Sequence, residues 1–288
     1  MKKSKLFSLV YALVLAGFTA FVALDSFVIP HVYAQTETPA PAPAAPQITG
    51  NSYDDGETRI TLSEYRVADT TVYVADVQLS SPDALSTILA QNAYGRNVTE
   101  TPSAMAARSG AILAVNGDYY GARERGYVIR NGVLYRSTGS RGQEDLVIDE
   151  NGNFSIIQED QVTAQQLLDG GAAQVLSFGP ALVTAGEVTV TASDEVGRAM
   201  ASNPRTAIAQ VGELHYLFAV ADGRTADSAG LSLLQLAEFL QSLGAQTAYN
   251  LDGGGSSAMI FNGQVVNHPT TTGRSSGERK VSDIVGIF

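Results

Sequence analysis

Apolar residues recur along this chain at two spacings, which predict different structures. Residues 70–80 (TTVYVADVQLS) alternate between apolar and polar side chains, as a strand with one buried face does. Residues 232–244 (SLLQLAEFLQSLG) place leucines on one helical face, and Ser232 with Gln235 forms a capping-box pattern at the start. We therefore expect a strand in the first segment and a helix that ends at Gly244 in the second.

Two shorter segments also carry helix signals. Residues 81–95 begin with Ser81 and Pro82, an N-cap followed by a first-turn proline, and they end at a glycine. Residues 101–110 (TPSAMAARSG) repeat this pattern. The sequence therefore predicts helices over both segments.

Asparagine–glycine pairs between apolar runs indicate β-hairpins. Asn131-Gly132 divides VIRNGVLY, and Asn151-Gly152 divides LVIDENGNFSII. Further short β segments surround these hairpins, and regular alternation of strand and helix is missing, so a Rossmann or TIM architecture is not expected. The pattern predicts an α+β fold: a single domain with a large, mostly antiparallel mixed sheet, several hairpins and a few flanking helices.

The chain begins with the pattern of a targeting segment. A basic start, MKKSK, precedes an uncharged apolar stretch over 6–24, and Val32 and Ala34 occupy the −3 and −1 positions of a signal-peptidase site. The stretch is also long enough to span a bilayer. Residues 1–34 are therefore a signal peptide or an N-terminal membrane anchor, and both alternatives place the remainder outside the membrane.

A Pro/Ala-rich segment over 35–48 (QTETPAPAPAAPQI) follows the apolar stretch. Such a composition behaves as an extended linker. A linker in this position suits a domain that is held off a membrane or threaded into cell wall. We expect one folded domain over 49–288, exported to the cell surface or the medium.

Composition excludes several kinds of chemistry. The chain has no cysteine and three histidines, which excludes thiolate nucleophiles and makes a multi-histidine zinc site or a His-based triad implausible. Its net charge of −11 argues against nucleic acid as a partner. An anionic ligand must therefore be held by a few local groups.

The stretch YNLDGGGSSAM is the first candidate site. Asn250 and Asp252 lie two residues apart, so they share one face of an extended strand. The three glycines that follow allow successive N–H groups to converge on an anion, and two serines add hydroxyl donors. The alternative is a plain hairpin whose glycines provide steric room.

A second apolar strand ends in a similar way. In AVNGDYYG, Asn116 and Asp118 share a face, and convergence of the two strand ends would place Asp118 near Asp252. Glycosidic cleavage commonly uses two carboxyl groups, one as an acid and one as a nucleophile or base. The alternative for Asn116 and Asp118 is an Asx turn after a strand.

Arginines complete the set of candidate ligands. Arg205 precedes an apolar strand in NPRTAIAQV, and Asp222 and Arg224 follow one in AVADGRTADSAG. Arginine binds phosphate oxygens in a bidentate manner, which an acidic protein needs if its ligand is anionic. The alternative is that these are ordinary solvated loop charges.

Taken in order, AVNGDYYG, NPRTAIA, ADGR and YNLDGGGSSAM, closed by ERKVSDIVGIF, resemble the phosphodiester glycosidase family. The resemblance implies a mixed α/β domain that hydrolyses the sugar C1–O bond of a sugar-1-phosphodiester of the N-acetylglucosamine-α-1-phosphate type. Asn116, Arg205, Asp222 and Asp252 each fall within one of the matching motifs. Many relatives carry a small residue where this chain has Asp118.

These patterns lead to one functional hypothesis and two rivals. We expect Asp252, Asp118 and Asp222 to be catalytic. The expected ligands of the sugar and phosphate are Asn116, Arg205, Thr206, Arg224, Asn250, Gly253, Gly254, Gly255, Ser256 and Ser257. No cofactor is required, although calcium or magnesium could bind among the three aspartates. The main rival is a non-catalytic module that binds phosphodiester-containing cell-wall glycans through the same pocket. A third possibility is an exported structural protein whose glycines only form turns.

Overall fold

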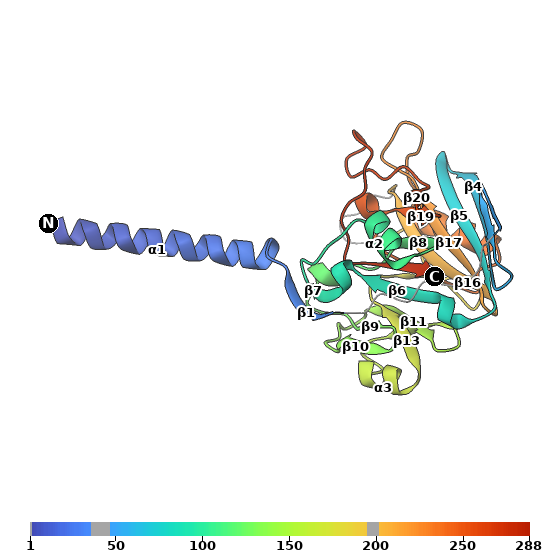
Figure 1. Ribbon diagram of the computed structural model, residues 1–288, viewed down its shortest axis with the longest axis horizontal. Coiled ribbons are helices and arrows are strands. Elements are labelled where there is room, and N and C mark those ends of the chain that lie inside the picture. Colours follow the sequence, from blue (N-terminus) through green and yellow to red (C-terminus); the bar gives the residue numbers. More distant parts are fainter. Residues whose placement is uncertain (1, 36–46, 195–201) are drawn as a thin grey trace.

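A computed structural model describes residues 2–35, 47–194 and 202–288, and the domain within it is built mainly from three antiparallel sheets (Figure 1). The largest has nine strands, in the order β15 (Glu187–Val188), β14 (Ala181–Thr184), β18 (Thr247–Asn250), β16 (Arg205–Gly212), β17 (His215–Ala221), β5 (Thr70–Leu79), β4 (Thr58–Val67), β3 (Ser52–Asp54) and β2 (Gln47–Thr49). The second has five, in the order β20 (Gln264–Val265), β19 (Met259–Phe261), β8 (Leu113–Asn116), β21 (Asp283–Ile287) and β6 (Leu85–Leu89). The third also has five, in the order β10 (Val133–Arg136), β9 (Val128–Arg130), β13 (Ala172–Leu176), β11 (Glu144–Asp149) and β12 (Phe154–Gln158).

The main core lies between the nine-stranded sheet and the two smaller sheets. Phe218 and Tyr249 of the large sheet pack in one cluster with Val115 and Val285 of the second sheet and Leu146 of the third. All five side chains are buried, and burial of apolar surface is the main force that drives folding. The predicted α+β class with mostly antiparallel strands is confirmed.

Helices cover the outer faces of the sheets. They are α2 (Pro102–Ser109), α3 (Ala164–Asp169) and α4 (Leu233–Ser242), with short 3₁₀ turns η1 (Pro82–Ala84), η2 (Ala90–Asn92), η3 (Tyr120–Ala122) and η4 (Gly254–Ser256). Helix α4 packs on the nine-stranded sheet, α2 on the second sheet and α3 on the third.

Local sequence explains the ends of these helices. The capping box between Ser232 and Gln235 is present at α4, and Gly110 ends α2 in the left-handed conformation, so both predicted helices are confirmed. A second capping box, Thr163 with Gln166, starts α3, a helix that was not predicted.

The helix predicted over 81–95 is wrong. Ser81 does cap a turn, but the chain then forms β6, η2 and β7 (Ala93–Arg96). Gln91 and Asn92 have φ of 54° and 52°, which no right-handed helix allows. Strand β6 pairs with β21 along its whole length, so pairing within the sheet overrides the local helix signals.

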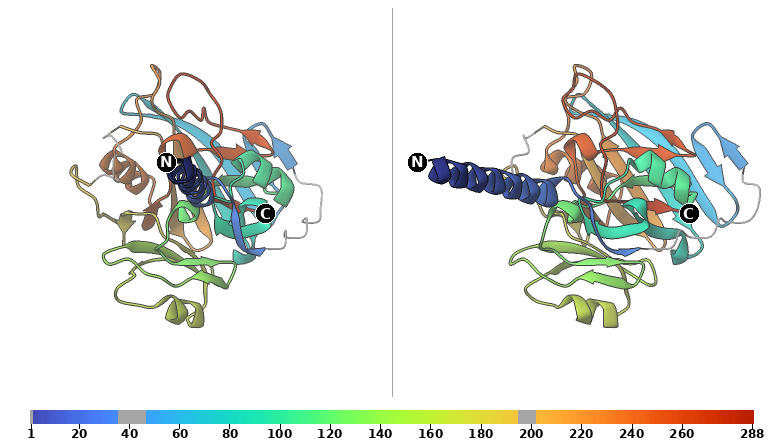
Figure 2. Two further views of the ribbon diagram at one scale, coloured as in Figure 1. Left: turned by 90° about the vertical axis from the view of Figure 1, so that its left-hand side faces the viewer. Right: turned by 60° about the vertical axis from the view of Figure 1, so that its left-hand side comes forward.

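The N-terminal helix α1 (Lys2–Phe27) extends away from the domain (Figures 1 and 2). Residues Leu6–Phe27 are long and apolar enough to cross a membrane, and none of this segment is buried within the protein. A short strand, β1 (His31–Gln35), follows and pairs with β7. The predicted linker over 35–48 lies mostly outside the described residues.

Candidate active site

Strand ends from two sheets meet at one point, as expected from the sequence. In the large sheet Ala207 of β16 pairs with Asn250 at the end of β18. In the second sheet β8 ends at Asn116. The main-chain N–H of Asp252 donates to the main-chain oxygen of Gly117 over 3.2 Å and links the two strand ends.

Asn116 fixes this junction from within. Its Oδ1 accepts from the Thr206 hydroxyl at 2.8 Å and from the main-chain N–H of Ala258 at 3.2 Å. Its Nδ2 donates to the main-chain oxygen of Asp252 at 2.6 Å. The side chain is buried, and both ends of the amide have partners. Asn116 and Thr206 therefore position the Asp252 segment, and orienting Asp252 is one of the two roles expected for Asn116.

Asp252 lies just beyond the end of β18, in a cleft of about 230 Å³. Its Oδ2 accepts from the Ser256 hydroxyl at 2.5 Å and from Nη2 of Arg279 at 3.0 Å. Burial raises the pKa of this carboxyl, and the bonds from Ser256 and Arg279 oppose the rise. The geometry thus presents one carboxylate, held by a hydroxyl and a guanidinium, at the wall of a cleft.

The cleft combines predicted and unpredicted groups. Asp118 and Ser256 line it together with Asp252, as expected. Arg279 and Lys280 line it as well, and neither was predicted to have a role. Both belong to the segment ERKVSDIVGIF, where two adjacent cations precede a terminal strand, and that signal could have identified them.

The glycines serve close packing in this structure. A Cβ on Gly253 would lie 2.9 Å from the oxygen of Pro204, and one on Gly255 would lie 2.7 Å from the Thr271 hydroxyl. Gly254 has a φ of 61°, and its N–H donates to the oxygen of Pro204. The N–H groups of Ser256 and Ser257 likewise donate to oxygens of the same loop. These donors are therefore used within the protein, and the expected cradle of free amides is not formed by them.

The remaining predicted ligands lie around the junction but outside the cleft lining. Arg205 is buried and donates from Nε to the oxygen of Leu231 at 2.9 Å. Arg224 lies against Gly254 and donates to Asn203 Oδ1 and to the oxygen of Thr271. Asn250 is buried and donates to the oxygen of Gly179. Their hydrogen bonds thus link Arg205 to the 231 segment, Arg224 to the 203 and 271 segments, and Asn250 to Gly179.

Asp118 is part of a buried ion cluster. Its Oδ2 accepts from Nη2 of Arg130 at 2.8 Å and from the main-chain N–H of Ser177, and its Oδ1 accepts from the N–H of Tyr120. Arg130 also donates from Nε to Asp283 Oδ2 at 2.9 Å, and all three ionisable side chains are fully buried. Asp118 thus accepts three hydrogen bonds and is paired with a buried guanidinium, so a role for it as a freely acting acid does not fit this arrangement.

Asp283 is the less satisfied acid of that cluster. Its Oδ1 has no hydrogen-bond partner within the described part of the chain, and it lies close enough to Gly117 that a Cβ there would be 2.3 Å away. Burial, together with the nearby charges of Asp118 and Asp252, raises the pKa of Asp283 to about 8, against the lowering effect of Arg130. Neither Arg130 nor Asp283 was predicted as a site residue, although a lone charge within an apolar strand is the signal for both.

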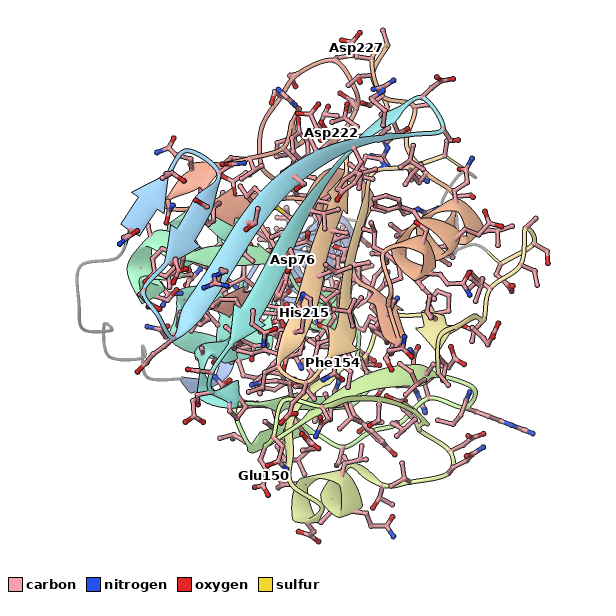
Figure 3. All side chains as sticks on the ribbon, turned by 90° about the vertical axis from the view of Figure 1, so that its right-hand side faces the viewer. Asp76, Glu150, Phe154, His215, Asp222 and Asp227 are labelled. Carbon is pink, nitrogen blue, oxygen red and sulfur yellow. The ribbon has the colours of Figure 1, made fainter. Side chains whose placement is uncertain are left out.

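Asp222 faces a different cleft, of about 480 Å³, at the end of the nine-stranded sheet (Figure 3). Its carboxylate accepts from the main-chain N–H of His268 at 2.9 Å and lies 3.1 Å from Nδ1 of the same residue. It also accepts from Asn267, which in turn donates to the oxygen of Ser257. The expectation that Asp222 shares the Asp252 site is therefore not met.

The same separation affects the expected cation site. Asp118 pairs with Arg130, Asp222 faces the second cleft, and Asp252 is bound by Arg279. Among the described residues no group of three or more His, Asp and Glu side chains is arranged to hold a metal ion. Calcium or magnesium binding by these three aspartates therefore has no geometric support.

Comparison of the chain with known protein families identifies the class to which this fold and this cleft belong. Residues 109–288 match the phosphodiester glycosidase family, to which this chain belongs. The match includes Asn116, Asp252 and Arg279 and begins at the last residue of α2.

Two known sequences show what the chain is similar to over part of its length. The chain is 29% identical over 182 residues to the SPbeta prophage-derived uncharacterized protein YomE of Bacillus subtilis, covering 61% of this chain and 28% of that protein. It is 28% identical over 179 residues to the mouse N-acetylglucosamine-1-phosphodiester α-N-acetylglucosaminidase, covering 56% of this chain and 34% of the mouse protein. The chain thus spans between about a quarter and about a third of the length of these relatives.

A solved structure shares the fold. The catalytic domain of the zebrafish N-acetylglucosamine-1-phosphodiester α-N-acetylglucosaminidase, auto-inhibited by its pro-peptide, superposes with a TM-score of 0.63 at 21% identity. The alignment covers 90% of this chain and 88% of the zebrafish chain.

Proposed function

We propose that this protein is an exported glycosidase that hydrolyses the sugar C1–O bond of a sugar-1-phosphodiester. The observation that supports this most directly is the Asp252 carboxylate, held by Ser256 and Arg279 at the wall of a cleft that Lys280 also lines. Family membership and the name of the mouse relative support the same chemistry, with N-acetylglucosamine-α-1-phosphate as the substrate type.

The two cations suit the phosphate part of such a substrate. A phosphodiester carries a full negative charge, and C1–O cleavage leaves a phosphomonoester that gains a second charge. Because the second pKa of a phosphomonoester is about 6, the leaving group departs at neutral pH without needing a proton. Arg279 and Lys280 stabilise that developing charge, which is the type of effect that contributes most to many enzymatic rate enhancements.

Asp252 acts on the sugar side of the bond. It either attacks C1 itself or removes a proton from the water that does so, and both routes need its ionised form. Ser256 and Arg279 favour that form by donating to Oδ2. The balance of the reaction is simple: water adds its hydroxyl to C1, its proton is released, and the bridging oxygen leaves with phosphorus.

Sugar release and isotope position test this proposal together. The full chain in detergent micelles is incubated with the methyl ester of N-acetylglucosamine-α-1-phosphate in ¹⁸O-water. We expect N-acetylglucosamine that carries the label at C1 and unlabelled methyl phosphate. Label in the phosphate would indicate attack at phosphorus and contradict the proposal.

A matched pair of variants assigns the activity to Asp252. Asp252→Asn removes the charge with little change in shape, and we expect a loss of at least about 10²-fold in kcat, of the order seen for removal of one key catalytic group. Asp76→Asn is the control, because Asp76 is 54% exposed on the nine-stranded sheet and forms an ion pair with His215, away from the cleft (Figure 3). Binding of the ester without sugar release would instead favour the non-catalytic glycan-binding module.

A further inference from the structure

The N-terminal helix is rooted beside the proposed catalytic cleft. Asn97, which lines the cleft, donates from Nδ2 to the main-chain oxygen of Ser26 in the last turn of α1, at 3.0 Å. Figure 1 and the right-hand view of Figure 2 show α1 leaving the domain as a rod, and Figure 1 shows its root at β1 and β7. The end of the helix and the wall of the cleft are therefore in contact.

Strand β1 fixes this position. Only residues 28–30 separate α1 from β1, and β1 pairs with β7, where Val32 lies opposite Gly95. A Cβ at Gly95 would lie 1.8 Å from the main-chain oxygen of His31, so only glycine permits this approach. Strand β7 then leads directly into Asn97 and Thr99 of the cleft wall.

The surface of α1 matches the interior of a bilayer. Its apolar side chains are exposed, among them Phe7 at 74% and Phe18 at 64%. A segment as long as Leu6–Phe27 spans the hydrocarbon core, which is about 30 Å thick. With α1 in a membrane, Ser26 and Asn97 lie at the boundary, within the polar layer of roughly 5–8 Å that holds the lipid headgroups.

The cleft that Asn97 lines also offers cations. Lys280 is the only lysine beyond residue 5 in a chain of net charge −11, and it lines the cleft next to Arg279. Tyr119, 43% exposed, lies at the same cleft, and tyrosine is enriched at membrane–water interfaces. A headgroup phosphate that enters the cleft beside Asn97 would therefore meet these cations.

Building on the proposed function, we propose that the substrate is a lipid-linked sugar-1-phosphodiester, in which the phosphate joins C1 of the sugar to a membrane lipid alcohol. Hydrolysis adds the hydroxyl of water to C1 and leaves the lipid phosphomonoester in the membrane. The sugar is released to the aqueous side. The cleft is anchored where such a phosphate resides, so enzyme and substrate are confined to one thin layer.

The test compares a lipid substrate with a soluble one. The full chain is reconstituted in phosphatidylcholine vesicles that contain polyprenyl-phosphate-linked N-acetylglucosamine, and the methyl ester of N-acetylglucosamine-α-1-phosphate serves as the soluble substrate. Confinement raises effective concentration, so we expect kcat/KM for the lipid ester to exceed that for the methyl ester by at least about tenfold.

An insertion separates anchoring from chemistry. Ten Gly/Ser residues between Pro30 and His31 leave β1 and the domain unchanged but let the cleft move away from the surface by about 17–19 Å on average. We expect turnover of the lipid ester to fall by about tenfold or more, while turnover of the methyl ester changes less than about twofold.

A point variant tests the β1–β7 contact itself. Gly95→Ala should displace β1 and reproduce the selective loss, whereas Gly50→Ala, where a Cβ meets nothing within 4 Å, should behave as the wild type. Val32→Pro disrupts the same β1–β7 pairing from the β1 side, outside residues 49–288. It replaces Gly95→Ala in the test if that variant folds poorly.

The outcomes distinguish the two proposals. Hydrolysis of the methyl ester with no preference for the lipid ester, or with equal effects of the insertion on both, would overturn the lipid substrate and leave the proposed function standing. Failure to hydrolyse either ester would overturn both. Selective loss with the lipid ester supports both.

Discussion

Replacing Asp283 with asparagine should make the stability of this protein less dependent on pH. Asp118 accepts three hydrogen bonds, two of them from main-chain N–H groups, whereas the only donor to Asp283 among the described residues is Arg130. One guanidinium cannot fully compensate two buried carboxylates, so the less satisfied acid keeps its proton. That acid is Asp283, whose pKa is raised to about 8, chiefly by burial.

The sign and size of the effect follow from linkage. The folded protein holds a proton on Asp283 up to about pH 8, and the unfolded chain releases it near its ordinary value of 3.8. The folded state therefore binds more protons across this window, and the free energy of unfolding falls as pH rises. At about 1.4 kcal/mol per pH unit, the loss between pH 4 and pH 8 is at most about 5 kcal/mol. A neutral asparagine removes this pH dependence.

Urea unfolding at a series of pH values measures the pH dependence of the free energy of unfolding. The difference in free energy of unfolding between Asp283→Asn and the wild type should rise by several kcal/mol, by the same linkage, from pH 4 to pH 8. Asp145, also buried with a pKa raised to about 10, titrates in both proteins and cancels in the difference. Asp76→Asn is the exposed control. Parallel curves for wild type and variant would show that Asp283 is ionised in the fold and refute the reasoning.

Three further predictions concern the cleft and the junction behind it. The proposed mechanism uses the ionised form of Asp252, whose pKa burial raises, so activity should rise with pH as this carboxyl loses its proton. Arg279→Gln removes a donor that favours the ionised form and should shift this rise to higher pH. An unchanged rise in the kcat/KM profile would contradict this. Asn116→Ala leaves the Thr206 hydroxyl and the N–H of Ala258 without their acceptor, so the free energy of unfolding should fall by about 2–4 kcal/mol in urea or thermal unfolding. A fall of less than about 1 kcal/mol would mean that the junction relaxes around the missing amide. Gly255→Ala places a Cβ 2.7 Å from the Thr271 hydroxyl and 3.1 Å from its Cα, so it should lower stability by about 1–3 kcal/mol, and Gly50→Ala should not.

Much of the fold could be predicted from local sequence. Helix α4 follows from its leucine spacing and the Ser232–Gln235 capping box, and the hairpin at Asn131-Gly132 follows from two residues that both adopt positive φ. These features depend on residues within a few positions of each other. The segment 81–95 fails for the opposite reason, since its structure is decided by β21, which is distant in sequence.

The candidate site divides in the same way. The sequence by itself determined that Asn116 and Asp252 end two apolar strands and that an anionic ligand would need local cations. Only the tertiary structure decided which cations line the cleft beside Asp252: Arg279 does, whereas Arg205 and Arg224 donate to the oxygens of Leu231 and Thr271. Each arginine is a long flexible side chain, and its direction depends on the burial and the acceptors around it, which no local pattern specifies.

The tertiary structure also decided the balance of charge behind the cleft. The sequence contains Asp118, Arg130 and Asp283 at separate positions, and only the fold buries them together. Burial decides which carboxyl is ionised, because a carboxyl removed from water ionises only where hydrogen-bond donors replace the lost solvation. The pairing of β1 with β7 was also decided by the tertiary structure. It joins residues 31–35 to residues 93–96, and it depends on the close backbone approach that Gly95 permits.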